Sequence, residues 1–476
     1  MVIGDFIMNS VSNEFDLIII GSGPGGYIAA IRASQLGMRV CVVEKAEIGG
    51  VCLNWGCIPT KVLLRNAEVI GLFNRAREFG ITVEGFHPDF RAAIARSRRA
   101  ASRLSKGVNY LLKKNNVTHI SGSARLANKK YVEVFNEQGV SIGKYHGKNI
   151  LIATGGRPKS IPGLEIDERA ILSSSGALIQ DEPPSSMAII GAGAVGVEFA
   201  FIYSMYDTKV TLIEMLPHII PYADKEIAAI LTRSFKKQGI EIFTEARVEE
   251  VTKGNNDVSL KISGGNGSLV IESEKVLVAV GRRANSEDLG LEDLGINTDK
   301  GFIQTDSHFQ TTVPGIFAIG DVAGEPLLAH KASEEGKLTV EAISGFSESP
   351  IAPLENIPVC TYTHPEVASI GLTEDAAKEK GYEIKIGRFP FRANGKAVCI
   401  GEEEGLVKVI SEAESGEIIG VHIIGASATE LIAEISVAKR LKTSVMQLGT
   451  ITHAHPTLSE AIMESALDTV GRAIHI

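Results

Sequence analysis

The sequence lacks any apolar run long enough to form a transmembrane helix, since none of its hydrophobic stretches approaches the ~18 residues that a membrane span requires. It also lacks an excess of positive charge: 57 Asp and Glu outnumber 48 Lys and Arg, and the formal net charge is −9. A dedicated nucleic-acid-binding protein needs a strongly basic surface, so this balance argues against that class.

Cysteine is scarce, with five residues in a chain of 476. An odd, small number in a long chain argues against a framework of structural disulfides. Residues 1–15 have no basic start followed by an apolar core, so we predict no secretory signal and expect a cytoplasmic protein. Structural disulfides are rare in that compartment, so any bridge that forms is expected to take part in chemistry.

Glycine is abundant, with 49 residues, and part of this excess lies in tight-turn motifs. The apolar run at 16–20 predicts a buried parallel strand. It is followed by the turn Gly21-Ser22-Gly23-Pro24-Gly25-Gly26 and by a predicted helix over 27–36. A second strand is predicted over 39–43, and it ends at Glu44.

The same order recurs in the middle of the chain. A strand is predicted over 186–190, a helix through Tyr206, and a second strand over 209–213 that ends at Glu214. In both copies the acidic residue follows the first glycine by 23 positions. Two copies at equal spacing are a strong signal for dinucleotide binding, whereas one would be weak. The motif glycines are Gly21, Gly23 and Gly26 in the first copy and Gly191, Gly193 and Gly196 in the second.

Each glycine in this motif has its own geometric role. The first makes a tight turn, the second lets a pyrophosphate approach, and the third lets the helix pack closely. The pyrophosphate then lies at the helix N-terminus, where free N–H groups favour an anion. We expect Glu44 and Glu214 to accept hydrogen bonds from ribose hydroxyls. Residues 215–217 offer no cation for a 2′-phosphate, so the second site is predicted to prefer NAD over NADP. Two such sites indicate a flavin and a nicotinamide.

A pair of cysteines follows the first motif closely, in the segment Cys52-Leu53-Asn54-Trp55-Gly56-Cys57. Positions five apart lie on different faces of a regular helix, so a bridge requires the backbone to bend, which Gly56 permits. A small constrained loop suits a reversible disulfide. Among the other cysteines, Cys41 is predicted to be a buried apolar residue, and Cys360 and Cys399 have no paired spacing, so no metal site is assigned.

Thiol–disulfide exchange requires a thiolate, and histidine is the natural proton acceptor near neutral pH. The C-terminal segment offers both His453 and His455, and spacing alone does not decide between them. Glu460 is placed to orient one of the two rings. Further upstream, the run at 311–321 is predicted to be a strand that leads into Gly320-Asp321, where Asp321 can accept a flavin ribityl hydroxyl.

From about residue 14 to the C-terminus, these segments resemble those of the dihydrolipoamide dehydrogenases, which belong to the class I pyridine nucleotide-disulfide oxidoreductases. The resemblance implies an α/β fold with two Rossmann-like dinucleotide-binding domains and a C-terminal α+β dimerisation domain. Apolar stretches at 406–410 and 418–424 and helical patterns at 428–441 and 457–470 agree with that last domain. The expected division is an FAD-binding domain (residues 1–155), an NAD-binding domain (156–280), a central domain completing the FAD site (281–356) and an interface domain (357–476).

The resemblance also implies roles for individual residues. Cys52 is similar to the thiol that exchanges with substrate, Cys57 to the thiol against the flavin, His455 to the base, and Glu460 to its orienting partner. The base comes from the other subunit of a homodimer in this family. FAD is expected at the first motif and NAD at the second. The remaining cofactor-binding residues implied are Glu44, Ala124, Thr154, Gly155, Asp321, Leu327, Leu328, Ala329 and His330 for FAD, the ion pair Lys61–Glu198 near the flavin N5, and Glu214, Val248 and Gly281 for NAD.

The implied reaction oxidises protein-bound dihydrolipoamide with NAD⁺, in a 2-oxo acid dehydrogenase or glycine cleavage complex. Rival enzymes fit less well: glutathione-type reductases prefer NADPH, mercuric reductases carry a C-terminal cysteine pair, and soluble transhydrogenases lack the redox pair. A pure docking subunit is a further alternative. Residues 91–130 contain eleven Lys and Arg and no Asp or Glu. We interpret this basic run as the solvent-exposed face of a helix, and a polyanion or partner site is the alternative. Residues 1–13 lie outside the resemblance, and Met8 is an alternative start.

Overall fold

The computed structural model describes residues 13–264, 267–346 and 356–476, and these divide into two compact units. Unit 1 takes its described residues from Met1–Trp55, Ala101–Arg157 and Arg282–Ile351. Unit 2 takes them from Gly56–Ala100, Pro158–Gly281 and Ala352–Ile476. The division into four segments that the sequence predicts stays a prediction, and the possible start at Met8 lies outside the described residues.

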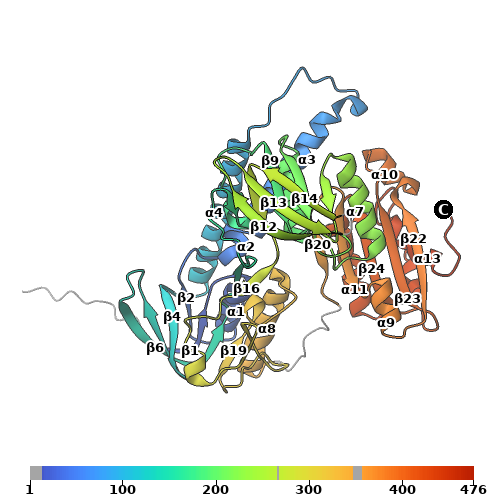
Figure 1. Cartoon of the computed structure of the whole chain (residues 1–476). Coiled ribbons are helices and arrows are strands. Elements are labelled where there is room, and N and C mark those ends of the chain that lie inside the picture. Colours follow the sequence, from blue (N-terminus) through green and yellow to red (C-terminus); the bar gives the residue numbers. More distant parts are fainter. Residues whose placement is uncertain (1–12, 265–266, 347–355) are drawn as a thin grey trace, which may run out of the picture. The chain divides into compact units, whose positions relative to one another are not determined.

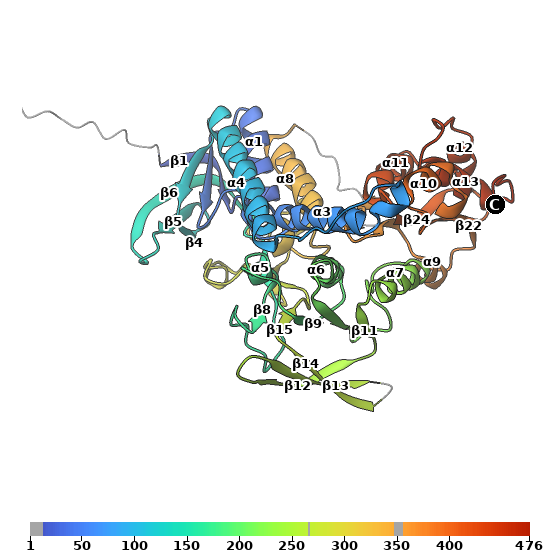
Figure 2. The same cartoon turned by 90° about the horizontal axis from the view of Figure 1, so that it is seen from above.

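Unit 1 is built on one mixed sheet, of which Figure 1 labels β1, β2, β4, β6 and β19. Its parallel core has the strand order β3-β2-β1-β6, with β19 beside β6. The strands β4 and β5 extend it in antiparallel fashion. The helices α1 (Pro24–Gln35) and α8 (Ala329–Ser344) lie side by side in this unit (Figure 2). The strands are β1 (Glu14–Ile20), β2 (Val40–Glu44), β3 (Thr118–Ser121), β4 (Ser123–Asn128), β5 (Tyr131–Phe135), β6 (Ser141–Ile152) and β19 (Ile316–Ala318).

Unit 2 contains a second parallel sheet, with the order β11-β10-β9-β15-β8, and a three-stranded antiparallel sheet, β12-β13-β14. Helix α3 (Cys57–Asn74) packs against α6 (Ala194–Ser204). The strands are β8 (Ile171–Leu172), β9 (Ser186–Ile190), β10 (Lys209–Ile213), β11 (Glu241–Phe243), β12 (Arg247–Lys253), β13 (Val258–Gly264), β14 (Gly267–Ser273) and β15 (Lys275–Val278).

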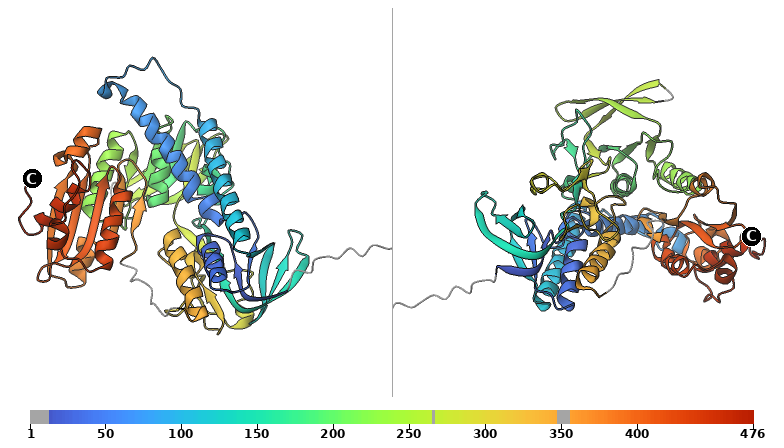
Figure 3. Two further views of the ribbon diagram at one scale, coloured as in Figure 1. Left: turned by 180° about the vertical axis from the view of Figure 1, so that it is seen from behind. Right: turned by 90° about the horizontal axis from the view of Figure 1, so that it is seen from below.

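The C-terminal part of unit 2 is a five-stranded sheet in the order β20-β21-β24-β23-β22, all antiparallel. Helices α11 (Ala428–Arg440) and α13 (Glu460–Asp468) pack on it, and α7 (Lys225–Lys237) contacts β24 (Figure 3). The strands are β20 (Val359–Thr361), β21 (Glu366–Gly371), β22 (Ile384–Pro390), β23 (Leu406–Glu412) and β24 (Ile418–Gly425), and the shorter helices are α9 (Glu374–Glu379), α10 (Gly395–Ile400) and α12 (Val445–Gly449).

These observations confirm the predicted fold class, since both glycine motifs lie between a parallel strand and a helix and the C-terminal region is α+β. The predicted helix at 27–36 begins earlier, at Pro24, because proline is favoured in the first helical turn. The predicted strand at 311–319 is shorter, with only Ile316–Ala318 paired in the sheet. The start of the basic run forms α4 (Phe90–Lys114). No helix among residues 13–264, 267–346 and 356–476 is long and apolar enough to cross a membrane.

A buried cation fastens α7 to the C-terminal sheet. Lys408 of β23 is 2% exposed, and its Nζ donates to both oxygens of Asp224 at 2.9 and 3.0 Å and to Glu374 at 2.8 Å. Asp224 also caps α7 by accepting from the Glu226 N–H. Hydrogen bonds from Lys378 and Lys408 hold the pKa of Glu374 at about 2, well below its ordinary 4.5.

We expect this cluster to make the protein sensitive to acid. A carboxylate whose pKa is depressed in the folded state stabilises it above the unfolded pKa of 4.5, and that contribution is lost as the pH falls towards about 2. Lys408→Met leaves the buried Asp224 carboxylate without its ammonium partner and should cost roughly 3–5 kcal/mol at neutral pH. The urea midpoint, measured against pH, tests this. Lys225→Met removes an exposed ion pair with Asp375 and should lower stability far less, because exposed pairs contribute little. Equal losses of stability in the two variants would contradict the role given to Lys408.

Candidate functional site

The first glycine turn lies in unit 1 between β1 and α1. Gly21 has a φ of +101°, and a Cβ there would lie 2.4 Å from the Ala153 carbonyl oxygen. A Cβ on Gly26 would lie 2.0 Å from the Gly21 oxygen, so this glycine allows α1 to approach the strand. At Gly23 no described atom lies within 4 Å of the Cβ position, and no side chain caps α1. The geometry of Gly21 and Gly26 fits the tight turn and the close helix packing predicted for them, and the open space at Gly23 leaves room for a pyrophosphate, whose binding there stays a prediction.

Glu44 closes this turn from the end of β2. It is 8% exposed, and its Oε2 accepts from the Ser22 N–H at 2.8 Å and from the Ser22 hydroxyl at 2.7 Å. Its Oε1 accepts from the Ala46 N–H at 2.9 Å. The carboxylate is thus fixed beside the glycine turn, where a ribose hydroxyl can donate to it.

The second glycine turn, in unit 2, repeats this geometry. Gly191 has a φ of +95°, and a Cβ on Gly196 would lie 1.9 Å from the Gly191 oxygen. Gly193 again has no described atom within 4 Å of its Cβ position. Glu214 is 7% exposed and accepts from the Ala192 N–H and from the Leu216 N–H, each at 2.8 Å.

The two turns fit dinucleotides. In each, the open space at the middle glycine leaves the backbone accessible, and the uncapped N-terminus of a helix of eleven or twelve residues provides free N–H groups for a pyrophosphate. In each, a buried glutamate accepts from two backbone N–H groups at equivalent positions, one in the glycine turn and one two residues after the glutamate. Both donor sets therefore suit a dinucleotide such as FAD or NAD.

Asp321 lies in unit 1 in η3 (Gly320–Val322), directly after β19. Its Oδ2 accepts from Arg282 Nε at 3.3 Å, and Arg282 also donates to the Gly156 oxygen. In the same unit, three hydrogen bonds tie Thr154 and Gly155 to Asn285: Thr154 Oγ1 donates to the Asn285 oxygen, and Asn285 donates its backbone N–H to Gly155 and its amide to the Thr154 oxygen.

The two cysteines of the predicted redox pair lie on either side of a helix break. Cys52 is in α2 (Gly50–Asn54) and Cys57 is the first residue of α3, with Gly56 as its N-cap residue. Both side chains are half-buried. The predicted bend in the backbone between them is confirmed. Cys41, in contrast, is fully buried in β2, and burial raises the pKa of its thiol to about 12, as expected for an unreactive core residue.

Lys61 and Glu198 form an ion pair in unit 2, from α3 and α6. Lys61 Nζ donates to both carboxylate oxygens at 2.9 Å, and Glu198 is 4% exposed. Tyr362 holds this pair from a third segment: its N–H donates to Glu198 Oε1 at 3.0 Å, and its ring centroid lies 4.4 Å from Lys61 Nζ. The sequence gives no indication of Tyr362, because nothing local to residue 362 points to residue 61.

The two candidate histidines have different surroundings. His453 has only 7% of its side chain exposed, and both ring nitrogens are engaged, Nε2 with Glu434 at 2.8 Å and Nδ1 with the Ile451 oxygen at 2.9 Å. His455 is 78% exposed, and its Nδ1 lies 2.9 Å from Glu460 Oε1. A hydrogen bond at Nδ1 leaves Nε2 as the proton-accepting nitrogen.

Glu460 is itself well held. Burial alone would raise the pKa of its carboxyl group, but the Thr457 N–H, which donates to Oε2 at 2.8 Å, and the His455 ring outweigh burial and lower the pKa. Glu460 is therefore an ionised acceptor that can fix the ring orientation of His455.

The remaining predicted cofactor residues are dispersed within each unit. In unit 1, Ala124 lies in β4, and Leu328 is the N-cap residue of α8. In unit 2, Val248 lies in β12, and Gly281 has a φ of +105° and accepts from the Lys159 N–H. Leu327 precedes the α8 cap, and Ala329 and His330 begin that helix.

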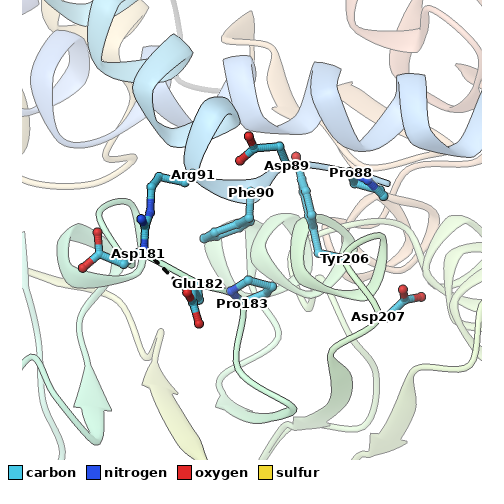
Figure 4. A pocket seen from close by; sticks show the side chains of 9 residues that line it. All are labelled: Pro88, Asp89, Phe90, Arg91, Asp181, Glu182, Pro183, Tyr206 and Asp207. Atoms are coloured by element: carbon cyan, nitrogen blue, oxygen red, sulfur yellow. Dashed lines mark ion pairs between the residues drawn. The ribbon is translucent and has the colours of Figure 1, made fainter. Parts of the chain in front are cut away.

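A pocket of about 370 Å³ elsewhere in unit 2 is lined by none of the predicted site residues (Figure 4). Its wall carries four carboxylates, and Arg91 pairs with one of them, Glu182, at 3.5 Å. Within the described parts of the chain, no group of three or more His, Cys, Asp and Glu side chains is arranged to hold a metal ion. The lining residues are Pro88, Asp89, Phe90, Arg91, Asp181, Glu182, Pro183, Tyr206 and Asp207.

The chain matches two family models, pyridine nucleotide-disulphide oxidoreductase over residues 15–336 and the dimerisation domain of that family over 357–466. The dihydrolipoyl dehydrogenase of Rhizobium etli is 44% identical to this chain, and the alignment covers 98% of this chain and 100% of the Rhizobium protein. The solved structure of LpdA from Mycobacterium tuberculosis aligns with a TM-score of 0.88 at 26% identity, over 96% of this chain and 99% of its own. The solved structure of the HOCl-induced flavoprotein disulfide reductase RclA from Escherichia coli aligns with a TM-score of 0.84 at 26% identity. That alignment covers 95% of this chain and 99% of the RclA chain.

Proposed function

Since this chain belongs to the pyridine nucleotide-disulphide oxidoreductase family, we propose that it oxidises protein-bound dihydrolipoamide to lipoamide with NAD⁺ as the final acceptor. The observation that carries this proposal is the Cys52–Cys57 pair directly after the first dinucleotide turn, in a chain 44% identical to a dihydrolipoyl dehydrogenase over nearly its whole length. The cofactors are FAD and NAD.

The residues that hold these cofactors follow from the two turns. Glu44 and Asp321 would hold the ribose and ribityl hydroxyls of FAD, and Glu214 would hold the ribose of NAD. The Lys61–Glu198 pair, fixed by Tyr362, would lie near the flavin ring. When bound, FAD supplies the two-electron chemistry that links thiols to a nicotinamide acceptor.

The protein side of the reaction is thiol–disulfide exchange. His455 Nε2 takes the proton of one substrate thiol, and the resulting thiolate attacks Cys52 Sγ, so that a substrate–Cys52 bond forms and the Cys52–Cys57 bond breaks. The second substrate thiol then displaces Cys52 and closes the lipoyl disulfide. Two electrons and the associated protons have passed from the substrate to the enzyme, which now holds the reduced cysteine pair.

We place the base of one subunit at the cysteine pair of the other, so that only a homodimer is active. This agrees with the match of residues 357–466, which contain His455 and Glu460, to a dimerisation domain. The substrate group would be carried by the lipoyl domain of a 2-oxo acid dehydrogenase or glycine cleavage complex, and we expect the reaction in the cytoplasm, where NAD⁺ is available.

The experiment that tests this proposal is steady-state NADH formation from dihydrolipoamide and NAD⁺ by the purified protein, with the flavin content measured in parallel. A flavin-containing protein that forms NADH supports it. A protein without flavin, or a flavoprotein that does not oxidise dihydrolipoamide, would overturn it.

We expect a strong preference for NAD⁺ over NADP⁺. The Glu214 carboxylate would repel a 2′-phosphate, and a like-charge contact of this kind costs several kcal/mol, so kcat/KM should differ by at least about 10²-fold. Glu214→Ala should shrink that ratio by lowering activity with NAD⁺ and removing the repulsion of NADP⁺. Equal use of both nucleotides by the unaltered protein would contradict the role given to Glu214.

A further inference from the structure

Helix α8 carries a buried ion pair that has no part in the steps above. Lys331 Nζ lies 3.0 Å from Glu335 Oε1, one helical turn further along, and the two side chains are 5% and 6% exposed. Removing two charges from water is costly, and buried pairs of this kind often stabilise a protein no better than apolar residues do. Stability alone therefore does not account for the pair, and the contacts of the two side chains indicate another role.

Both members of the pair bind the backbone of one turn. Glu335 Oε2 accepts from the Gly320 N–H at 2.7 Å, and Lys331 Nζ donates to the Gly324 oxygen at 2.9 Å. Gly320 and Gly324 have φ values of +72° and +128°, the left-handed region that glycine adopts readily. The pair thus holds both ends of the five-residue turn that contains Asp321.

Helix α8 is in turn fixed against α1, the helix of the first glycine motif. A Cβ on Gly336 would lie 2.6 Å from the Gly25 oxygen, and a Cβ on Gly25 would lie 3.0 Å from the Ala332 oxygen. Backbones this close leave α8 little freedom to shift along α1. The position of the Asp321 turn is therefore set, through Lys331 and Glu335, relative to the helix that begins at the glycine turn.

The charge of Glu335 depends on its neighbours. Burial raises the pKa of Glu335, and the Lys331 ammonium and the Gly320 N–H oppose that effect. The carboxylate therefore relies on both of its partners, and removing either one leaves a buried polar group unsatisfied.

We propose that Lys331 and Glu335 form a positioning pair that sets the Asp321 carboxylate against the first glycine turn for binding of the FAD ribityl chain. This inference rests on the proposed function. Neither side chain is required to touch the cofactor; both act through the backbone of residues 320–324. The consequence is that FAD affinity depends on the pair more than folding does.

The test is Glu335→Gln, which keeps the size of the side chain and one acceptor oxygen but removes the charge. For the purified holoprotein we would measure the rate of FAD release by flavin fluorescence, and the thermal midpoints of FAD release and of unfolding by circular dichroism. Loss of a side chain that orients a metal ligand typically costs 10–100-fold in metal affinity. We expect an effect of the same order here, with FAD release at least about tenfold faster. Its thermal midpoint should fall below that of unfolding.

The matched control is Glu341→Gln, which removes another ion pair of α8, at 2.7 Å to Arg32 of α1, but leaves the Asp321 turn untouched. In this control, the thermal midpoints of FAD release and of unfolding should shift by the same amount. A purely structural role for Glu335 predicts the same joint shift in Glu335→Gln, and that result would overturn the proposal.

If Glu335→Gln does not fold, the double variant Lys331→Met/Glu335→Gln removes the unpaired charge and restores a neutral core. We expect this double variant to fold and to release FAD faster than the unaltered protein does. FAD release at the rate of the unaltered protein would contradict the inference. Absence of FAD from the unaltered protein would instead refute the proposed function, so the two failures are distinguishable.

Discussion

Replacing Cys52 by Ser is expected to lower the turnover of dihydrolipoamide with NAD⁺ at least about 10³-fold. Losses of this size follow the removal of a side chain that forms a covalent intermediate with the substrate. A serine oxygen cannot form the bond that the substrate thiolate must attack, so no electrons can enter the protein by that route. FAD should stay bound, because the residues proposed to hold it lie in the glycine turn and near Asp321. NADH formation and flavin content, measured on the same sample, report the two effects separately.

The matched control is Cys399→Ser, since Cys399 is an exposed cysteine of α10 outside the proposed site. Its activity should equal that of the unaltered protein. Retention of turnover in Cys52→Ser, or an equal loss in Cys399→Ser, would show that the cysteine pair does not carry the reaction.

Replacing His455 by Gln should lower kcat by about 10²-fold or more, the usual contribution of a general base. The loss should be smaller at about pH 9 than at about pH 7, because the fraction of substrate thiol that ionises without a base rises with pH. A pH profile of the variant against the unaltered enzyme measures this. A loss that is the same at every pH would point to a packing defect and not to a missing base.

His453→Gln distinguishes between the two histidines. Both nitrogens of His453 are engaged with Glu434 and the Ile451 oxygen, so its replacement should lower stability and leave most of the catalysis. The assignment of the base to His455 would be wrong if His453→Gln lost more kcat than His455→Gln and regained it at high pH.

Much of the fold follows from local sequence patterns. The strands at 186–190 and 209–213 have the predicted bounds, because an apolar run between turn residues specifies a buried parallel strand. The run at 311–319 is less regular, since only Ile316–Ala318 pairs with β6. The local sequence pattern of this run could not show how many of its residues pair with another strand. That pairing depends on β6, which lies over 150 positions earlier in the chain.

The site divides in the same way. The motif glycines and their glutamates are predictable, because spacing along a strand–turn–helix unit fixes their geometry. Spacing does not choose between His453 and His455, because their different surroundings depend on Glu434 of α11 and on how exposed each ring is. The sequence does not reveal Tyr362, Lys331 and Glu335, because they act through contacts that only the folded chain creates.

The most direct test of the account is differential alkylation of the cysteines, read by mass spectrometry under denaturing conditions. Before treatment, Cys52 and Cys57 should resist labelling because they are linked, while Cys41, Cys360 and Cys399 are labelled. After anaerobic addition of one equivalent of dihydrolipoamide without NAD⁺, both Cys52 and Cys57 should become labelled. Labelling of this pair before the addition, or resistance after it, would contradict the claim that substrate electrons enter through these two sulfurs.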